Sequence, residues 1–175
     1  MKQHRLVPPV AKIEPVTDLF AAYSPELGEV LFSEFSVFAM GLHYFDRETR
    51  EVVRLRCARV NGCDLCKSQR WVDDNGLPIS QEVSAAIDAY ESADLPEEQK
   101  AALRIVDAFL NNPSAAADQG FRARAYEHFD ASQILSLLLD SMKWSAAKIG
   151  VALELDEPNG SAMYFDETGA QHILA

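Results

Sequence analysis

The sequence predicts an all-α domain of six to eight helices, and three observations support this fold class. Apolar residues recur at spacings of three and four along most of the 175-residue chain, which is the pattern of amphipathic helices. Signals that start helices (Ser, Asp, Pro) and stop them (Asn, Gly) separate these stretches. No segment alternates between apolar and polar residues before the C-terminal tail, residues 157–175, so strands are not expected there. The length fits one domain, residues 1–175.

The N-terminal part predicts an arm followed by a helix. Residues 1–17 contain three prolines and are expected to be extended. The first helix is expected to begin at Pro25, because Ser24 is a suitable N-cap and proline is favoured at the first helical position. The apolar residues of this helix have helical spacing and are Leu27, Val30, Leu31, Phe35 and Phe38.

Two helices are expected to flank a pair of cysteines. Asp46 is a candidate N-cap for a helix that includes Thr49–Val60, and Asn61-Gly62 is a stop signal. A new helix is expected to start at Cys63 or Asp64 and to continue to Asn75-Gly76. The cysteine pair would then lie at the start of the second of these helices.

The second half of the chain predicts four more helices and a short tail. The helices are expected at Ser80–Tyr90, Pro96–Asn112, Asp118–His128 and Ala131–Leu155. In the tail, residues 163–173 flank the turn sequence Asp166–Gly169 and are expected to form a small hairpin or an extended arm.

The charge of the chain excludes several classes of partner. It has 27 Asp and Glu residues against 16 Lys and Arg residues, a formal net charge of −11. This charge repels phosphate backbones and anionic lipid surfaces, so neither nucleic acid nor a membrane is expected as a partner. No apolar run is long enough to span a bilayer, and Met1–Pro15 lacks the apolar core of a signal peptide. We therefore expect a cytoplasmic protein.

All three cysteines lie in residues 51–76, a stretch with five cations and four anions. Cys63 and Cys66 form a C-x-x-C motif, which at a helix start brings two sulfurs within reach of a disulfide. A zinc site is a second interpretation. Only Cys57 and four scattered histidines are available as further ligands, so no metal is expected. Buried, inert cysteines are a third interpretation, which the polar residues around the motif disfavour.

The surroundings of the motif favour a reactive thiol. A helix N-terminus and nearby cations both lower the pKa of a thiol. Arg59, Lys67 and Arg70 each lie four residues from Cys63 or Cys66, a spacing that brings side chains together on a helix. Glu51 lies twelve residues before Cys63 and is a candidate proton acceptor if the two helices pack side by side.

These residues resemble a known family. Glu51, eleven residues, then Cys-x-x-Cys, with the lead-in Arg54-Leu55-Arg56 and Val60-Asn61-Gly62-Cys63, is similar to the alkylhydroperoxidase AhpD / carboxymuconolactone decarboxylase family, over Phe45–Gly76. The resemblance implies an all-α fold, a homo-oligomer (trimer or hexamer) and thiol-dependent peroxide reduction without a cofactor or metal. It also implies that Cys66 is the peroxidatic residue, Cys63 the resolving residue and Glu51 part of the proton relay.

The chain departs from the family at Arg70. The family motif continues C-x-x-C-x-x-x-H, and the histidine passes protons between the glutamate and the thiol. Arginine stays protonated, so Arg70 is able to stabilise a thiolate or pair with Glu51 but not to shuttle a proton. A histidine found inside the C-x-x-C of some members is Leu65 here. His43, just upstream, is a candidate substitute base.

The expected function is therefore a thiol oxidoreductase that reduces hydroperoxides at Cys63 and Cys66 and is reset by an external dithiol. One alternative is a decarboxylase-like lyase acting on a small carboxylate held by Arg70. Another is a non-catalytic relative in which the cysteine pair is a redox switch.

Overall fold

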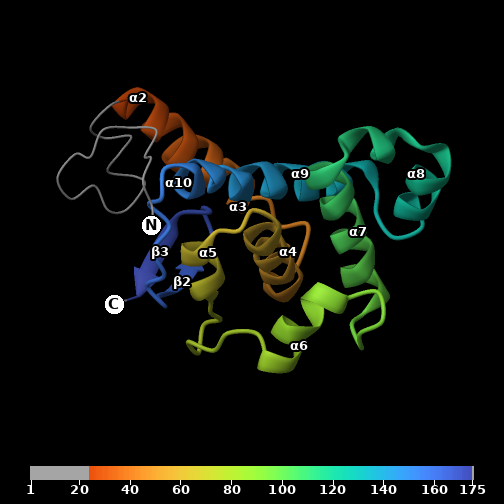
Figure 1. Ribbon diagram of the computed structural model, residues 1–175, viewed down its shortest axis with the longest axis horizontal. Coiled ribbons are helices and arrows are strands. Elements are labelled where there is room, and N and C mark those ends of the chain that lie inside the picture. The colour runs from red at the N-terminus through yellow and green to blue at the C-terminus, as the bar shows by residue number, and fades with distance from the viewer. Residues whose placement is uncertain (1–23, 175) are drawn as a thin grey trace.

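The computed structural model of the chain describes residues 24–174, and the arm expected at residues 1–17 lies outside them. The described part is mostly helical with one small sheet, which confirms the predicted all-α fold (Figure 1). The helical elements are α2 (Pro25–Gly28), the π-helical η1 (Glu29–Phe35), α3 (Ser36–Met40), α4 (Arg47–Val60), α5 (Asp64–Ser68), α6 (Gln81–Ala86), η2 (Ile87–Ala89), α7 (Glu97–Asn111), η3 (Pro113–Ala117), α8 (Gln119–Tyr126), α9 (Ala131–Ser145) and α10 (Lys148–Ala152). The strands are β1 (Arg70–Trp71), β2 (Ala162–Phe165) and β3 (Gln171–Leu174).

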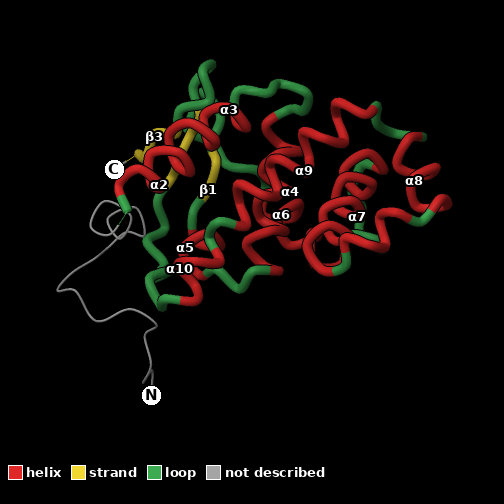
Figure 2. The backbone as a smooth tube through the Cα atoms, turned by 90° about the horizontal axis from the view of Figure 1, so that it is seen from above, coloured by secondary structure: helices red, strands yellow, loops and turns green. Residues whose placement is uncertain are grey.

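Helix α4 is the centre of the packing and contacts both α7 and α9. Its buried side chains divide between two hydrophobic clusters. Val53 packs with residues of α7 and α9, and Leu55 packs with residues of η2 and α7. Figures 1 and 2 show α8 at one end of the molecule and α5 with the sheet at the other. The cysteine pair therefore lies at the end that holds the sheet.

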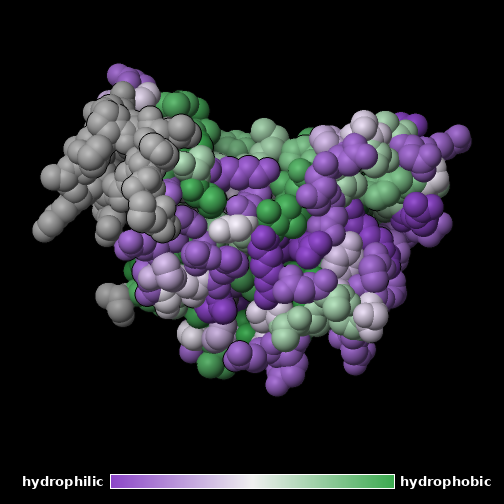
Figure 3. Space-filling model, viewed as in Figure 1, coloured by the Kyte–Doolittle hydropathy of each residue, from purple (hydrophilic) through white to green (hydrophobic). Residues whose placement is uncertain are grey.

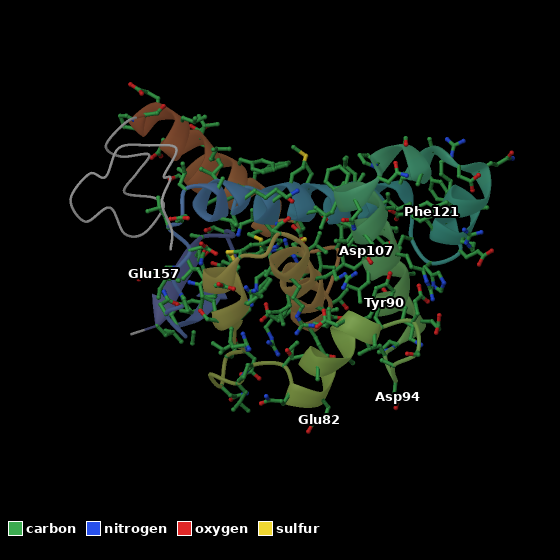
Figure 4. All side chains as sticks on the ribbon, viewed as in Figure 1. Glu82, Tyr90, Asp94, Asp107, Phe121 and Glu157 are labelled. Atoms are coloured by element: carbon green, nitrogen blue, oxygen red, sulfur yellow. A yellow bond between two sulfur atoms is a disulfide. The ribbon has the colours of Figure 1, made fainter. Side chains whose placement is uncertain are left out.

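A half-buried polar contact joins three elements beside this core. Arg56 of α4 donates to both carboxylate oxygens of Asp107 in α7, at 2.7 and 2.8 Å. The hydroxyl of Tyr90, which follows η2, donates to Asp107 Oδ2 at 3.0 Å. Figure 4 shows Tyr90 and Asp107 pointing toward one another. Burial and the Asp107 charge raise the pKa of Tyr90, so its hydroxyl keeps the proton that it donates.

Side-chain caps fix the starts of four helices, whereas Ser24, the predicted N-cap of the first helix, makes no side-chain cap hydrogen bond. Asp46 accepts from the Thr49 N–H at 2.7 Å, and Asp130 forms a reciprocal capping box at the start of α9. Ser80 and Asp118 cap α6 and α8 in the same way. These contacts are local in sequence, which is why a cap such as that of Asp46 is predictable from the capping residue alone.

Two predicted helix ends are wrong. The helix after Cys63 was expected to reach Asn75-Gly76, but α5 ends at Ser68 and the chain turns into β1. The Arg70 and Val72 N–H groups donate to Ser161 O and Met163 O, so pairing with a distant strand replaces helical bonds. The last helix was expected to reach Leu155.

That last helix instead stops at Ser145. A short turn at Ala146 and Ala147 separates α9 from α10, which ends at Ala152. Two residues further on, Glu154 has a φ of 57°, a left-handed conformation that does not continue a helix. The chain then runs toward the cysteine pair.

The C-terminal tail forms the hairpin that the sequence allowed, and its first strand, β2, contributes Met163 to the core, whereas β3 is exposed. β2 pairs antiparallel with β3 and parallel with β1, with Arg70 opposite Ala162. Gly169 in the turn has a φ of 90°, and a side chain there would collide with Val37 O and Gly41 N at the end of α3. Met163 is fully buried. The hairpin thus fixes the segment that directly follows the cysteines.

No helix between residues 24 and 174 has both the length and the apolar character needed to cross a membrane.

Candidate redox site

The cysteine pair lies where α4 ends and α5 begins. Helix α4 closes with a Schellman motif, in which the Cys63 N–H donates to Ala58 O and the Gly62 N–H donates to Arg59 O. Gly62 takes a φ of 70°, which favours glycine at this position. The motif reverses the chain and leaves Cys63 in extended backbone as the N-cap of α5. The local sequence Asn61-Gly62-Cys63 therefore places the first sulfur.

The two sulfurs are joined as a disulfide. Cys63 and Cys66 have Cα atoms 5.3 Å apart, and the Cys63 sulfur also accepts the Cys66 N–H at 3.2 Å. Cys63 is buried, whereas Cys66 is half-buried. The pair therefore combines one buried and one half-buried cysteine, an asymmetry that suits a two-step thiol reaction.

Cys57 lies in a different environment from this pair. It is a free, buried thiol in the cluster between α4, α7 and α9. Burial raises its pKa to about 12, so it stays protonated and unreactive. Cys57 is therefore a residue of the hydrophobic core.

Glu51 lies under the cysteine segment and is fully buried. Its carboxylate accepts two hydrogen bonds from Arg54, at 2.5 and 2.8 Å, and one from the Trp71 N–H at 3.2 Å. The expected pairing with Arg70 is absent from the hydrogen bonds and ion pairs of the described residues. The partner of Glu51 is instead an arginine of its own helix.

Arg54 was missed as a site residue by the sequence analysis. Its buried guanidinium binds Glu51 on one side and donates to Cys66 O and Gln69 O, both at 2.7 Å, on the other. It therefore connects the carboxylate of α4 to the end of α5. The signal that could have revealed it is its spacing of three residues from Glu51 in a helix that is apolar around that position.

Arg70 is the first residue of β1, two residues after the end of α5, and is half-buried. Its Nη1 donates to Lys67 O at 2.5 Å and to Gln69 O at 2.8 Å. These carbonyls are the ones that a helix end leaves without partners, so Arg70 caps the helix and adds a cation there. Its expected catalytic role stays a prediction.

Of the two other expected cations, Arg59 binds outside the cysteine segment and Lys67 binds within it. Arg59 donates to Ser84 O at 2.7 Å and forms an ion pair with Asp88 at 3.4 Å. Lys67 pairs with Asp64 within α5. His43, the candidate substitute base, is exposed, and its ring lies 3.2 Å from Glu167 O in the hairpin turn. Only Lys67 and Arg70 are thus retained on the cysteine segment itself.

Asp156 is a second residue that the sequence analysis missed. Its Oδ2 accepts from the Asp64 N–H at 2.9 Å and its carbonyl accepts from the Leu65 N–H at 2.8 Å. The first turn of α5 is therefore held by a carboxylate that arrives from the segment after α10. A negative charge at this helix end opposes the formation of a thiolate beside it. No local pattern predicts a contact across about ninety residues.

Buried charged side chains lie between α4 and α9. Arg50 forms a two-pronged ion pair with Asp140 of α9, at 2.8 and 2.9 Å. Lys143 is buried, and its Nζ lies 3.2 Å from the centre of the Trp144 ring. Desolvation moves the pKa of Lys143 well below its ordinary value. These contacts fix α4 against α9 and so position the helix that carries Glu51 and Arg54.

Among residues 24–174, no group of three or more His, Cys, Asp or Glu side chains is arranged to hold a metal ion. The chemistry that this site offers is that of a dithiol in which a buried carboxylate and several guanidinium groups control the cysteine segment.

These features define an AhpD-like helical fold with a Cys-x-x-Cys pair at the start of a short helix. A solved structure from Agrobacterium tumefaciens, ATU0492, has the same fold, with a TM-score of 0.63 and 21% sequence identity over 80% of this chain and 96% of that one. ATU0492 is a protein of unknown function for which a role as the antioxidant defence protein AhpD has been suggested. The resemblance inferred from the cysteine motif is thus confirmed for the fold.

Two relatives are similar in sequence. The uncharacterized protein Rv2313c of Mycobacterium tuberculosis is 29% identical over 138 residues, which cover 78% of this chain and 48% of that protein. The uncharacterized protein YdfG of Bacillus subtilis is 27% identical over 95 residues, or 54% of this chain and 65% of that one. The chain thus spans about half the length of its M. tuberculosis relative. No family model matches the sequence.

Proposed function

We propose that the protein is a thiol-dependent oxidoreductase that reduces hydroperoxides through Cys63 and Cys66. The observation that carries the proposal is the pairing of these sulfurs at the start of α5 with unequal exposure. A small substrate is able to reach the half-buried Cys66, while Cys63 is protected. The AhpD-like fold adds support, because a role in antioxidant defence has been suggested for the A. tumefaciens protein.

In the proposed reaction Cys66 attacks first. Its thiolate attacks the terminal oxygen of the hydroperoxide, so that an S–O bond forms and the O–O bond breaks. The electron pair leaves on the alkoxide, which takes up a proton to become an alcohol. The Cys63 thiol then attacks the Cys66 sulfenic acid, a disulfide forms and water leaves. The disulfide state corresponds to the oxidised end of this cycle.

Delivery of a proton to the alkoxide is the step that the residues of the site support least. Neither Arg54 nor Arg70 gives up a proton at ordinary pH. The Arg54 guanidinium separates the Glu51 carboxylate from Cys66. To act in the expected proton relay, Glu51 would therefore need another route for passing a proton to Cys66. We therefore assign proton delivery to water, and propose that Glu51 acts mainly by anchoring Arg54. Slow turnover follows, because a positioned acid typically contributes about 10²–10⁴-fold.

An external dithiol completes the cycle. Its thiolate attacks the Cys63–Cys66 disulfide, and a second exchange releases the oxidised reductant and returns two electrons and two protons to the pair. Such a reductant is maintained in reducing compartments, so a cytoplasmic location is part of the proposal. No cofactor or metal takes part in these steps.

A single-turnover experiment tests the proposal. Fully reduced protein is mixed with excess tert-butyl hydroperoxide, peroxide loss is measured, and the thiols are then blocked for mass spectrometry. We expect one peroxide consumed per chain and a disulfide between Cys63 and Cys66. Cys66→Ser should lose both, whereas Cys57→Ala is the matched control and should retain both. If the reduced protein consumes no peroxide, the proposal fails and the decarboxylase-like alternative becomes the better one.

A further inference from the structure

A cavity of about 360 Å³ lies beside Arg70. Its wall combines the arginine with an apolar stretch, Leu77, Pro78 and Ile79, and with the polar side chains of Gln81 and Ser84. This volume is within the range of small-molecule pockets, and such pockets typically have apolar walls with a few polar groups that orient the ligand. The disulfide is not part of the lining, so the cavity is distinct from the redox site but close to it along the chain.

The only formal charge on the cavity wall is positive. Arg70 uses Nη1 to bind two carbonyls of its own segment. Within residues 24–174 its Nε and Nη2 make no hydrogen bond and no carboxylate forms an ion pair with it. Arg50 and Arg54, by contrast, each have a buried carboxylate partner. A half-buried guanidinium that is fixed at one nitrogen and unpaired at the others is preorganised for an anion.

A second arginine orients the far side of the cavity. Arg59 Nη2 donates to the Ser84 carbonyl at 2.7 Å and lies 3.3 Å from the Ser84 hydroxyl oxygen. Because that oxygen accepts from Arg59, the hydroxyl proton is available to a ligand. The Arg59 Nη1 forms an ion pair with Asp88 at 3.4 Å, so the charge of this arginine is already paired and Arg70 is left as the group for an anion. Glu82, the carboxylate nearest in sequence to Gln81, is exposed and points away from the molecule (Figure 4).

We propose that this cavity binds the carboxylate of an alkyl carboxylic acid. Arg70 pairs with the carboxylate, the Ser84 hydroxyl donates to it, and the hydrocarbon chain lies along Leu77, Pro78 and Ile79. Cys66 and Arg70 are four residues apart, at most about 14 Å along the chain, a separation that the length of a medium-chain acid is able to span. This inference rests on the proposed function. The substrate class that it names is hydroperoxides that carry a carboxylate.

Ligand binding to the oxidised protein tests the cavity without any turnover. Hexanoate and its neutral analogue hexanamide are titrated by calorimetry. We expect hexanoate to bind about tenfold more tightly or better, since a charge-assisted pair replaces a neutral contact. Arg70→Gln should remove the preference and Arg70→Lys should retain part of it. Arg104→Gln, which removes an exposed arginine of α7, should leave the preference unchanged.

Equal affinity for the two ligands, or an unchanged preference in Arg70→Gln, would overturn the inference. Circular dichroism of each variant checks folding, and Arg70→Lys keeps the test valid if Arg70→Gln does not fold. Binding without peroxide consumption would reject the proposed function alone, and peroxide consumption without binding would reject this inference alone.

A kinetic experiment tests whether the carboxylate bound in the cavity belongs to the hydroperoxide substrate. Hexanoate should slow oxidation of the reduced protein by a carboxylate-bearing hydroperoxide by raising the hydroperoxide concentration needed for half-maximal rate. If hexanoate instead slows only the reduction of the disulfide by a dithiol, the cavity serves the reductant and the substrate assignment is wrong.

Discussion

Arg54 makes four hydrogen bonds, two to Glu51 and two to the carbonyls of Cys66 and Gln69. Through these bonds a residue in the middle of α4 sets the position of the cysteine that is proposed to react. The charged pair has no access to water, so each partner depends on the other. At this scale the site is a chain of buried hydrogen bonds rather than a cluster of free catalytic groups.

Removing Arg54 should destabilise the fold strongly. Arg54→Ala leaves the Glu51 carboxylate buried and uncompensated, which costs about 3–5 kcal/mol of the free energy of unfolding. Urea denaturation of the oxidised protein measures this. Arg104→Ala breaks the exposed pair with Glu91 and serves as the control, with an expected loss of about 0–1 kcal/mol. A similar, small loss in both variants would contradict the role assigned to Arg54.

Cys57 should make stability depend on alkaline pH. In the folded protein its pKa is about 12, whereas in the unfolded chain a thiol ionises near ~8.5. Above that pH the unfolded state releases the proton and the folded state does not, so stability falls with rising pH until about 12. Relative to Cys57→Ala, the unmodified protein should lose about 1.4 kcal/mol per pH unit between about pH 9 and pH 10. Parallel curves for the two proteins would show that Cys57 ionises normally.

At the scale of helices and strands, the features that the sequence predicts are those that depend on residues close to one another in the chain. Asp46, Ser80, Asp118 and Asp130 cap helices through bonds to residues three positions away, and the Asn-Gly signal correctly ended α4. The Cys-x-x-Cys motif was likewise found because its spacing is local.

What could not be predicted depends on contacts distant in sequence. β1 exists because Arg70 and Trp71 pair with a strand about ninety residues later, and helical spacing alone gives no reason to end α5 at Ser68. Arg54 was not singled out because a charged residue on a helix usually faces water, and only the packing of α5 over α4 buries it. Asp156 reaches α5 from beyond α10 in the same way.

The contact between Asp156 and α5 should control thiol acidity. With the protein reduced, we expect one sulfur of the pair to ionise below about 8.5, because a helix start and the nearby cations favour the thiolate. Asp156→Asn keeps an acceptor for the Asp64 N–H but removes the negative charge, so the thiol pKa should fall further. The rate of alkylation by iodoacetamide as a function of pH measures this value.

Glu157→Gln is the matched control for this experiment. It removes the next carboxylate along the chain, which is exposed at the edge of the molecule (Figure 4), and should leave the thiol pKa unchanged. An equal or higher thiol pKa in Asp156→Asn would mean that the carboxylate does not act on the sulfurs. Normal values for both cysteines of the unmodified protein would favour structural cysteines.

At the scale of the whole molecule, one apolar surface has no partner among the described residues, 24–174. Large apolar side chains are about half exposed on the segment from α2 to α3 and on α9, two elements that pack against each other. They are Leu27, Val30, Phe38, Leu135 and Met142. Figure 3 shows hydrophobic residues along the upper edge of the molecule, over these elements. Such a patch is typical of an interface, and because the family resemblance implies a homo-oligomer, we predict that a second copy of the chain covers it.

The protein should therefore form a homo-oligomer, as a trimer or hexamer. Sedimentation velocity at micromolar concentration should give a mass well above the 19.4 kDa of one chain. Phe38→Asp, which places a charge at the most exposed of these positions, should weaken the assembly. Sedimentation of the unmodified protein as a monomer would contradict the predicted homo-oligomer.

The central claim is that Cys66 takes the oxygen from a hydroperoxide and Cys63 then closes the disulfide. The most direct test uses Cys63→Ser, in which the second step cannot occur. After one equivalent of tert-butyl hydroperoxide, trapping with dimedone and peptide mass spectrometry should locate a single sulfenic acid adduct on Cys66. An adduct on Cys57, or no adduct while the Cys66 thiol remains intact, would contradict the claim.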